Sequence, residues 1–445
     1  MSWQLTKLSD FLIEREGRIK YELANTLGLQ RIKKIDFSGQ LYLDAYTDTK
    51  TDMIRVCSGD LVISGINAAK GAIAVHQGDE DVLATIHYSA YEFNPDRIST
   101  DFLTWYFKSS EFASLLKDQV SGGIKTELKA KHILPLQIKI PLLAEQLTIA
   151  EKLNNFRLKN LRAEIEIKKQ RSLVLKLRES IVHDALQGRL TENWRVNNKP
   201  EQTANQLVAE ISELKSRNAN SLKSRGKTST SAIDQIDMPF LIPDSWVWCR
   251  LGDLIEKNPR NGLSLKPVDY ETPTKTLKLS ATTSGEFDGT KCKYLNEAIE
   301  ADSYLWLKDG DILIQRANSL DFVGTAAVYR GDDNEFIYPD LMMKCRAVKQ
   351  EMTDYLHLVL SAQFTRMYYR KNSTGATGNM PKINQATIID TLIPVPPLDE
   401  QSKIMDQIRL MMGNISKLQF EIARSGKQLD LLLEAILKEV FIQSA

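Results

Sequence analysis

Cysteine is scarce in this chain of 445 residues, and its four cysteines lie far apart. No two of them have the C-x-x-C spacing of a zinc ribbon, and their separation argues against a disulfide framework. No apolar run reaches the roughly 18 residues that a membrane-spanning helix needs. The first residues also lack the apolar segment of a signal peptide. These absences predict a cytoplasmic protein with reduced thiols.

The motifs of several enzyme classes are also missing. There is no P-loop, no Gly-rich dinucleotide fingerprint after a strand, and no H-E-x-x-H among the five histidines. The Asn-Pro-Pro-Tyr and Asp-Pro-Pro-Tyr signatures of amino-methylating enzymes do not occur either. Basic and acidic residues nearly balance, 58 against 57, which excludes a uniformly basic coat protein but allows a local basic face. The sequence therefore predicts a chain without catalytic groups of its own.

What the chain does have is an internal repeat with a period of about 250 residues. Pairs of similar segments occur in the same order in both copies. They are Trp3–Asp10 with Trp246–Asp253, Gly59–Ile63 with Gly310–Ile314, Ser121–Gly123 with Ser373–Gly375, and Pro141–Gln146 with Pro396–Gln401. This order predicts a duplicated unit with small insertions in the second copy.

Each copy begins with β-rich segments bounded by Gly, Asp and Asn and continues into an amphipathic helix. Strands are predicted at 61–66, 71–76 and 82–93, then at 311–315, 325–330 and 336–348. Helices are predicted at 101–117, with Asp101 as N-cap, and at 354–370. These patterns predict two pseudo-symmetric α+β domains.

Each copy ends in a long helix with the alternating four- and three-residue spacing of a coiled coil. Asn160 and Gln170 interrupt the first seam, and Ser425 interrupts the second. Two matched seams favour an antiparallel pair of helices, although a buried helix face is the plainer alternative. The predicted seam residues are Ile149, Leu153, Phe156, Val174, Leu177 and Ile181, with Ile404, Ile408, Met411, Ile415, Leu418, Leu429, Leu432 and Ile436.

The repeat and the helices together predict five segments. These are a first domain at 1–140, a long helix at 141–190, a linker at 191–243, a second domain at 244–395 and a long helix at 396–445. No acidic residue occurs between Leu214 and Ile233. The linker is therefore expected to be a solvated, mobile connector.

Two binding modules without catalytic groups predict a bivalent binder, and polar, basic loops in both copies favour double-stranded DNA. Arg and Lys bind phosphates, Arg fits guanine and Asn fits adenine, while Gly allows close approach of the backbone. The candidate DNA-binding residues are Arg15, Lys20, Lys33, Asn67, Lys70, Gly123, Lys125, Thr126, Arg260, Lys266, Arg316, Asn318, Ser319, Arg370, Thr374, Thr377, Asn379 and Lys382.

Two alternatives remain open at this point. Asp96, Glu127 and Lys129 imitate the Mg²⁺-binding cluster of a stand-alone nuclease, although Asn379 takes the place of Glu127 in the second copy. A coiled-coil scaffold that does not bind DNA is the other alternative.

Six segments also resemble the specificity (S) subunit of type I restriction-modification systems over essentially the whole chain. They are Ile140–Gln146, Leu186–Thr191, Ile242–Asp253, Gly310–Ser319, Val323–Thr325 and Ile393–Gln401. Where the second copy has Arg316-Ala-Asn-Ser319, however, the first has Ser64-Gly-Ile-Asn-Ala68, and only Asn67 is similar.

The resemblance implies two target recognition domains, each reading one half of a bipartite, asymmetric DNA site. The long helices would set the spacing of the half-sites and dock two methyltransferase (M) subunits, and restriction (R) subunits would join the full complex. Methylation and cleavage, with S-adenosylmethionine, ATP and Mg²⁺, would belong to those partners. No metal or cofactor is expected in this chain.

Overall fold

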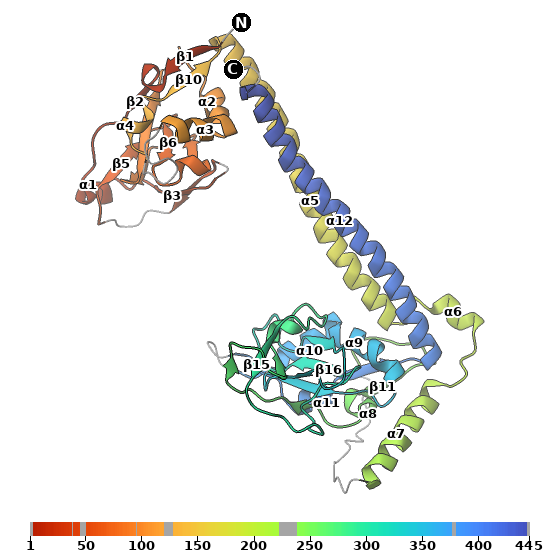
Figure 1. Ribbon diagram of the computed structural model, residues 1–445. Helices are drawn as coiled ribbons and strands as arrows, with labels where there is room; N and C mark the ends of the chain where they lie inside the picture. The colour runs from red at the N-terminus through yellow and green to blue at the C-terminus, as the bar shows by residue number, and fades with distance from the viewer. Residues whose placement is uncertain are drawn as a thin grey trace. The chain divides into compact units, whose positions relative to one another are not determined.

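The computed structural model describes residues 3–37, 39–44, 50–94, 96–119, 128–221, 238–375 and 380–442. The chain divides into two compact units, residues 1–170 with 421–445 and residues 171–420, and each has its own hydrophobic core (Figure 1). Among the described residues, no helix combines the length and apolar character needed to cross a membrane.

The first unit contains two four-stranded sheets and a small two-stranded sheet. The first sheet has the order β2 (Leu12–Glu14), β9 (Tyr88–Phe93), β6 (Leu61–Ser64) and β7 (Ile73–Val75). The second has the order β4 (Leu41–Asp44), β3 (Arg31–Ile35), β8 (Val82–Thr85) and β5 (Met53–Val56). The third pairs β1 (Gln4–Lys7) with β10 (Gln137–Ile140). Short helices α1 (Tyr21–Thr26) and α4 (Ala130–Ile133) complete the domain.

The second unit repeats this topology except for one edge strand of its second sheet. Its first sheet has the order β12 (Arg260–Asn261), β19 (Met342–Cys345), β16 (Ile312–Gln315) and β17 (Ala326–Val328). Its second has the order β13 (Pro267–Val268), β15 (Cys292–Leu295), β14 (Thr274–Leu277) and β18 (Phe336–Ile337). In this sheet the edge strand β13 pairs with β15, while β5 of the first unit pairs with β8. β11 (Val247–Arg250) pairs with β20 (Leu392–Val395), and short helices α8 (Leu251–Leu254) and α11 (Gln385–Ile389) follow the same plan. The parallel pair β14–β18 corresponds to β3–β8 in the first unit, so the structure contains the repeat that the sequence predicted.

Three predicted elements are divided in the structure. The helix expected at 101–117 is two helices, α2 (Thr100–Phe107) and α3 (Ser110–Gln119). Ser99, not Asp101, caps α2, and Ser109 accepts a hydrogen bond from the Phe112 amide, which starts a new helix.

The second unit shows the same kind of break. The helix expected at 354–370 is divided at the extended Ala362 into α9 (Thr353–Ser361) and α10 (Gln363–Lys371). The strand expected at 336–348 is interrupted near Pro339, which has no amide hydrogen for a sheet.

The long helices are α5 (Leu143–Leu186) and α12 (Leu398–Ile442). In the first unit, Leu153 near the start of α5 shares a core with Phe441 near the end of α12. In the second unit, Ala185 near the end of α5 shares a core with Ile404 near the start of α12. The two helices therefore form the antiparallel pair that the heptad spacing predicted (Figure 1).

The seam itself needs a correction at three positions. Leu177, Leu418 and Leu432 are 46%, 49% and 48% exposed, and Leu433 and Leu437 pack into the first unit's core where Leu432 was expected. A helix of 3.6 residues per turn drifts away from a strict heptad repeat, so the buried face moves by about one residue along α12. Buried or partly buried seam residues are Ile149, Leu153, Phe156, Val174, Ile181, Ile404, Ile408, Met411, Ile415, Leu429 and Ile436.

The segment 191–243 differs most from its prediction. It contains α6 (Glu192–Asn197) and α7 (Ala204–Ser221), and Leu207 and Ile211 of α7 are fully buried in the second unit's core. The interpretation as a solvated connector is therefore wrong for α7, because its i, i+4 apolar pair stands among polar residues in the sequence, whereas α6 buries none of its residues.

Candidate nucleic-acid interface

The turn after β16 brings together candidate residues from distant parts of the second unit. The Arg316 amide donates to the Leu341 carbonyl at 2.8 Å, and its own carbonyl accepts from the Ile383 amide at 2.9 Å. Lys382 forms β-bridges with both Ala317 and Thr374. Arg316, Thr374 and Lys382 thus lie on neighbouring backbone segments, although the sequence separates them widely.

Two guanidinium groups from this region line a cavity of about 430 Å³. Arg260, on the edge strand β12, stacks its guanidinium 3.4 Å from the ring centre of Tyr304, a cation–π arrangement. The buried Nε of Arg316 has no hydrogen-bond partner within the described residues. Asn384 and Gln385 also line the cavity, and no carboxylate does so. The chemistry of this cavity fits a phosphate group or the acceptor-rich edge of guanine.

Asn318 has a different role from the one its residue type suggested. Its amide nitrogen donates to Gln315 Oε1 at 2.6 Å, and its Oδ1 accepts from the Ser319 amide at 2.8 Å. Gln315 is buried, and its own amide donates to Thr282 and Thr283. The Asn318 side chain therefore fixes the turn that carries Arg316.

Arg370 also supports this turn. Its Nε donates to the Leu320 carbonyl at 3.0 Å, and the neighbouring Arg366 donates to the carbonyls of Asp321 and Val323. Burial, with a further contribution from the adjacent Arg370 charge, lowers the pKa of Arg366 to about 10. Both arginines hold the loop that follows Ser319. Lys266, which was also predicted to bind DNA, is exposed near β13.

In the first unit, Gly65 occupies the backbone position of Arg316. Its amide donates to the His87 carbonyl and its carbonyl accepts from the Leu128 amide, both at 2.8 Å, which repeats the pattern around Arg316. A glycine has no side chain to present there. The nearest candidates are Asn67 in the following turn and Lys70, whose ammonium lies 5.6 Å from the ring centre of Phe37.

The remaining candidate cations of the first unit are engaged in ion pairs. Arg15 binds the buried Asp60 at 2.9 Å, and in the second unit Arg346 binds the equivalent Asp311 at 2.8 Å. This pairing gives Arg15 a role in the fold. Two exposed pairs, Lys20–Asp52 at 3.2 Å and Lys33–Asp44 at 3.0 Å, partly neutralise the other two lysines.

Several predicted residues lie outside the part of the chain that the structure describes. They are Gly123, Lys125, Thr126, Thr377 and Asn379, together with Glu127 of the nuclease alternative. Among the residues that are described, no three His, Cys, Asp or Glu side chains gather to hold a metal ion.

Sequence reasoning missed several residues of the cavity, among them Tyr304 and Gln385. Tyr304 lies in a loop without a motif, more than 40 residues along the chain from Arg260. Gln385 donates its amide to the Pro259 carbonyl, which ties α11 to the segment preceding Arg260. No local pattern marks either residue, and only the fold places them beside the arginines.

Comparisons with known proteins show what this chain is similar to in sequence and fold. Residues 243–412 match the family model of the type I restriction modification DNA specificity domain. The chain is 24% identical to the type I restriction enzyme EcoKI specificity subunit of Escherichia coli (strain K12), over 77% of this chain and 65% of that protein. It is also 24% identical to the Escherichia coli EcoEI specificity subunit, over 52% of this chain and 39% of that protein. The matches span less than two thirds of the length of these relatives.

A solved chain reported with the complex assembly and conformational transition of the type I R-M system has a similar fold. It superposes with a TM-score of 0.62 at 14% identity, over 99% of this chain and 97% of that chain. At this identity the likeness concerns the fold.

Proposed function

Because this chain belongs to the type I restriction-modification specificity subunit family, we propose that it is the DNA specificity subunit of such a complex. It binds a bipartite, asymmetric site on double-stranded DNA, with one half-site for each recognition domain. The chain is non-catalytic, and it needs no metal or cofactor of its own. Methylation and cleavage belong to its partner subunits, which carry S-adenosylmethionine, ATP and Mg²⁺ in the cytoplasm.

The observation that carries this proposal is the cavity lined by Arg260 and Arg316. Two guanidinium groups that share a cavity without a carboxylate attract an anion strongly. Arg260 is stacked on Tyr304, and neither guanidinium hydrogen-bonds to another described residue, so both have donors left for a ligand. Arg316 is the residue we assign to a base edge, and Arg260 the residue we assign to a phosphate.

We assign the recognition domains to residues 1–140 and 244–395. The long helices, 141–190 and 396–445, set the distance between half-sites and dock two methyltransferase subunits, and restriction subunits join the full complex. Exposed apolar side chains along both helices support a docking role, among them Leu161, Ile165, Leu410 and Phe420.

Methylation mapping tests this function directly. Cells that express this chain with its methyltransferase subunit should accumulate N6-methyladenine in one bipartite sequence, and cells with either protein alone should not. Methylation without sequence preference would reject the proposal. A parallel incubation of the purified chain with DNA and Mg²⁺ tests the nuclease alternative, and we expect the DNA to remain intact.

A further inference from the structure

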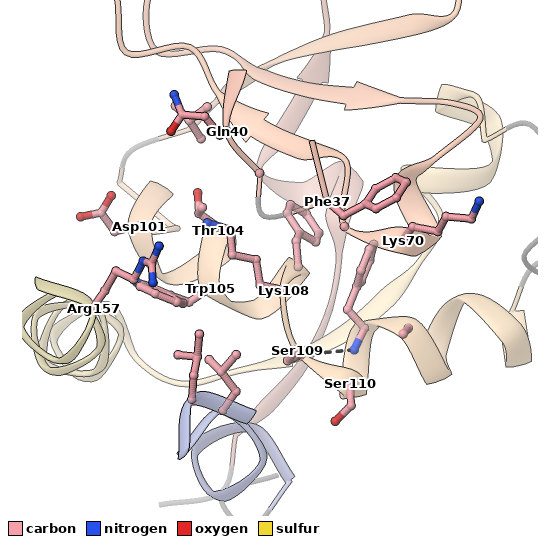
Figure 2. A pocket seen from close by; sticks show the side chains of 18 of the residues that line it. Phe37, Gln40, Lys70, Asp101, Thr104, Trp105, Lys108, Ser109, Ser110 and Arg157 are labelled. Carbon is pink, nitrogen blue, oxygen red and sulfur yellow. Dashed lines mark hydrogen bonds between the residues drawn. The ribbon is translucent and has the colours of Figure 1, made fainter. Parts of the chain in front are cut away.

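A second cavity lies in the first unit and has a different chemical character. It encloses about 1250 Å³ between the strands and helices of the first domain and the portions of α5 and α12 that belong to this unit. Figure 2 shows Arg157 and Trp105 at one side of it, Phe37 and Lys70 at the other, and Lys108 between them.

Lys108 is the unusual residue of this cavity. It follows the last turn of α2, and its ammonium lies 5.3 Å from the ring centre of Trp105. Among the described residues, no carboxylate forms a direct ion pair with the Lys108 ammonium, and none of their acceptors hydrogen-bonds to that ammonium. Burial, with a further contribution from the Arg157 charge, lowers the pKa of Lys108, and the nearby Asp36 charge opposes this shift. A partly buried cation without a direct ion pair is incompletely stabilised in the free protein, and an incoming anion would relieve this cost.

The cavity also has a second cation, Arg157, and apolar walls. Two carboxylates line it as well, those of Asp101 and Glu434, and Asp101 accepts a hydrogen bond from Asn154 at 2.8 Å. Arg157 forms a 2.6 Å ion pair with Glu164, and both side chains are exposed. Because an exposed ion pair contributes little free energy, Arg157 can leave Glu164 and bind another carboxylate at little cost. Leu41, Leu43 and Leu437 line the cavity beside the two cations. A ligand that is complementary to the two cations and the apolar lining must carry an anionic group between apolar groups. A protein segment with an acidic side chain between apolar side chains has this character, whereas a DNA backbone does not.

The cationic pair is specific to the first unit. In the second copy Ser361 and Met412 stand at the positions that correspond to Lys108 and Arg157 in the repeat. The pair is therefore not needed to build the repeated fold, which favours a role in binding.

We propose that this cavity receives an acidic segment of a methyltransferase subunit, with an Asp or Glu carboxylate bound by Lys108 and Arg157. Apolar side chains that flank the carboxylate pack on Leu41, Leu43 and Leu437. This inference rests on the proposed function, since it names the partner from it.

The experiment measures binding of the purified methyltransferase subunit to the full-length chain by calorimetry. Lys108→Met keeps the length of the side chain and removes its charge, and Arg157→Met does the same on α5. We expect each to weaken binding about 10- to 100-fold, since one charge of a desolvated pair would be left alone. Lys152→Met is the matched control, because Lys152 is exposed on α5 and does not line the cavity. It should bind as the parent does.

Two further readouts separate the outcomes. Lys108→Met should not lower the thermal unfolding midpoint, because it removes an unpaired cation, so weaker binding cannot be assigned to misfolding. If the parent chain binds the methyltransferase subunit and Lys108→Met binds equally well, the inference is wrong and the proposed function stands. If the parent chain does not bind the subunit at all, the proposed function fails. A change in DNA affinity without a change in subunit binding would instead assign the cavity to DNA and overturn the inference.

Discussion

Trp246 donates its indole N–H to Glu400 across 2.9 Å, and this bond ties the first residues of the second domain to the first turn of α12. Glu400 is 1% exposed and also accepts from Thr191 at 2.6 Å and from Arg195 at 3.0 Å. The first unit has the corresponding bond from Trp3 to Glu145, but it is longer, at 3.4 Å, and less buried. In each unit, the repeated Trp segment at the start of the domain therefore bonds to the repeated Glu-Gln segment at the start of the long helix. We call this contact the joint between domain and helix.

The first prediction concerns this joint. Glu400→Ala should lower the free energy of unfolding of the second unit by about 3–5 kcal/mol, because it leaves the partly buried Arg195 without its carboxylate partner. Glu145→Ala, at the weaker joint, should cost about 1 kcal/mol. Urea denaturation followed by tryptophan fluorescence measures both changes. Equal costs for the two variants would contradict the difference in burial between the joints.

A second prediction tests whether α7 is part of the second unit. Leu207→Ala should destabilise that unit by about 2–5 kcal/mol, because it opens a cavity in a packed core. Glu213→Ala on the exposed side of the same helix should change stability by less than about 0.5 kcal/mol. Thermal unfolding of the two variants provides the comparison. If Leu207→Ala is as mild as its control, α7 does not contribute to the core in solution.

The sequence predicted the features that rest on local or periodic signals. The Gly-Asp turns, the Trp and Glu-Gln segments and the heptads recur in both copies, so the repeat, the sheet-containing domains and the antiparallel helices could be inferred. The aspartate of each Gly-Asp turn is buried against an arginine, but Arg15 and Arg346 reach it from different strands. Sequence alone could not show that Arg15 has this role, since its charge equally suits DNA.

The binding site was predicted only in part, because the type of a residue does not show whether its side chain binds a ligand or supports the fold. Arg316 and Asn318 stood out because they follow a strand, yet the structure commits Asn318 to Gln315 and leaves Arg316 Nε unpaired. Which polar side chains are already satisfied depends on tertiary contacts. Tyr304 could not be found at all, because its role depends on a stacking partner distant in the sequence.

A third prediction separates base reading from phosphate binding at Arg316. Arg316→Ala should reduce discrimination by about 1–3 kcal/mol at one base pair of the second half-site. Affinities of the complex for DNA with single substitutions across both half-sites measure this. The change should be absent from the first half-site, where Gly65 holds the equivalent backbone position. Lost discrimination in the first half-site would contradict the assignment of residues 244–395 to the second.

The fourth prediction concerns Arg260. Arg260→Ala should weaken binding nearly uniformly across DNA sequences and reduce the slope of log affinity against log salt by about 1, as expected for one lost phosphate contact. Tyr304→Leu should have a smaller effect in the same direction, because it removes the ring that orients the guanidinium. Titrations at several salt concentrations measure the slopes. A sequence-dependent loss with an unchanged slope would instead make Arg260 a base-reading residue.

The last prediction concerns the helices as a spacer. Seven residues inserted into both helices, after Gln170 in α5 and before Glu421 in α12, should preserve the apolar seam, because a heptad returns the same face to the partner helix. The insertion adds about 10 Å of helix at 1.5 Å per residue, which corresponds to about 3 base pairs at 3.4 Å of DNA rise for each pair. Methylation mapping should then find the same two half-sites separated by a longer gap. Inserting the heptad in α5 alone should disrupt pairing with α12 and reduce methylation at every spacing. Methylation at the original gap by the double insertion would show that the helices do not set the distance.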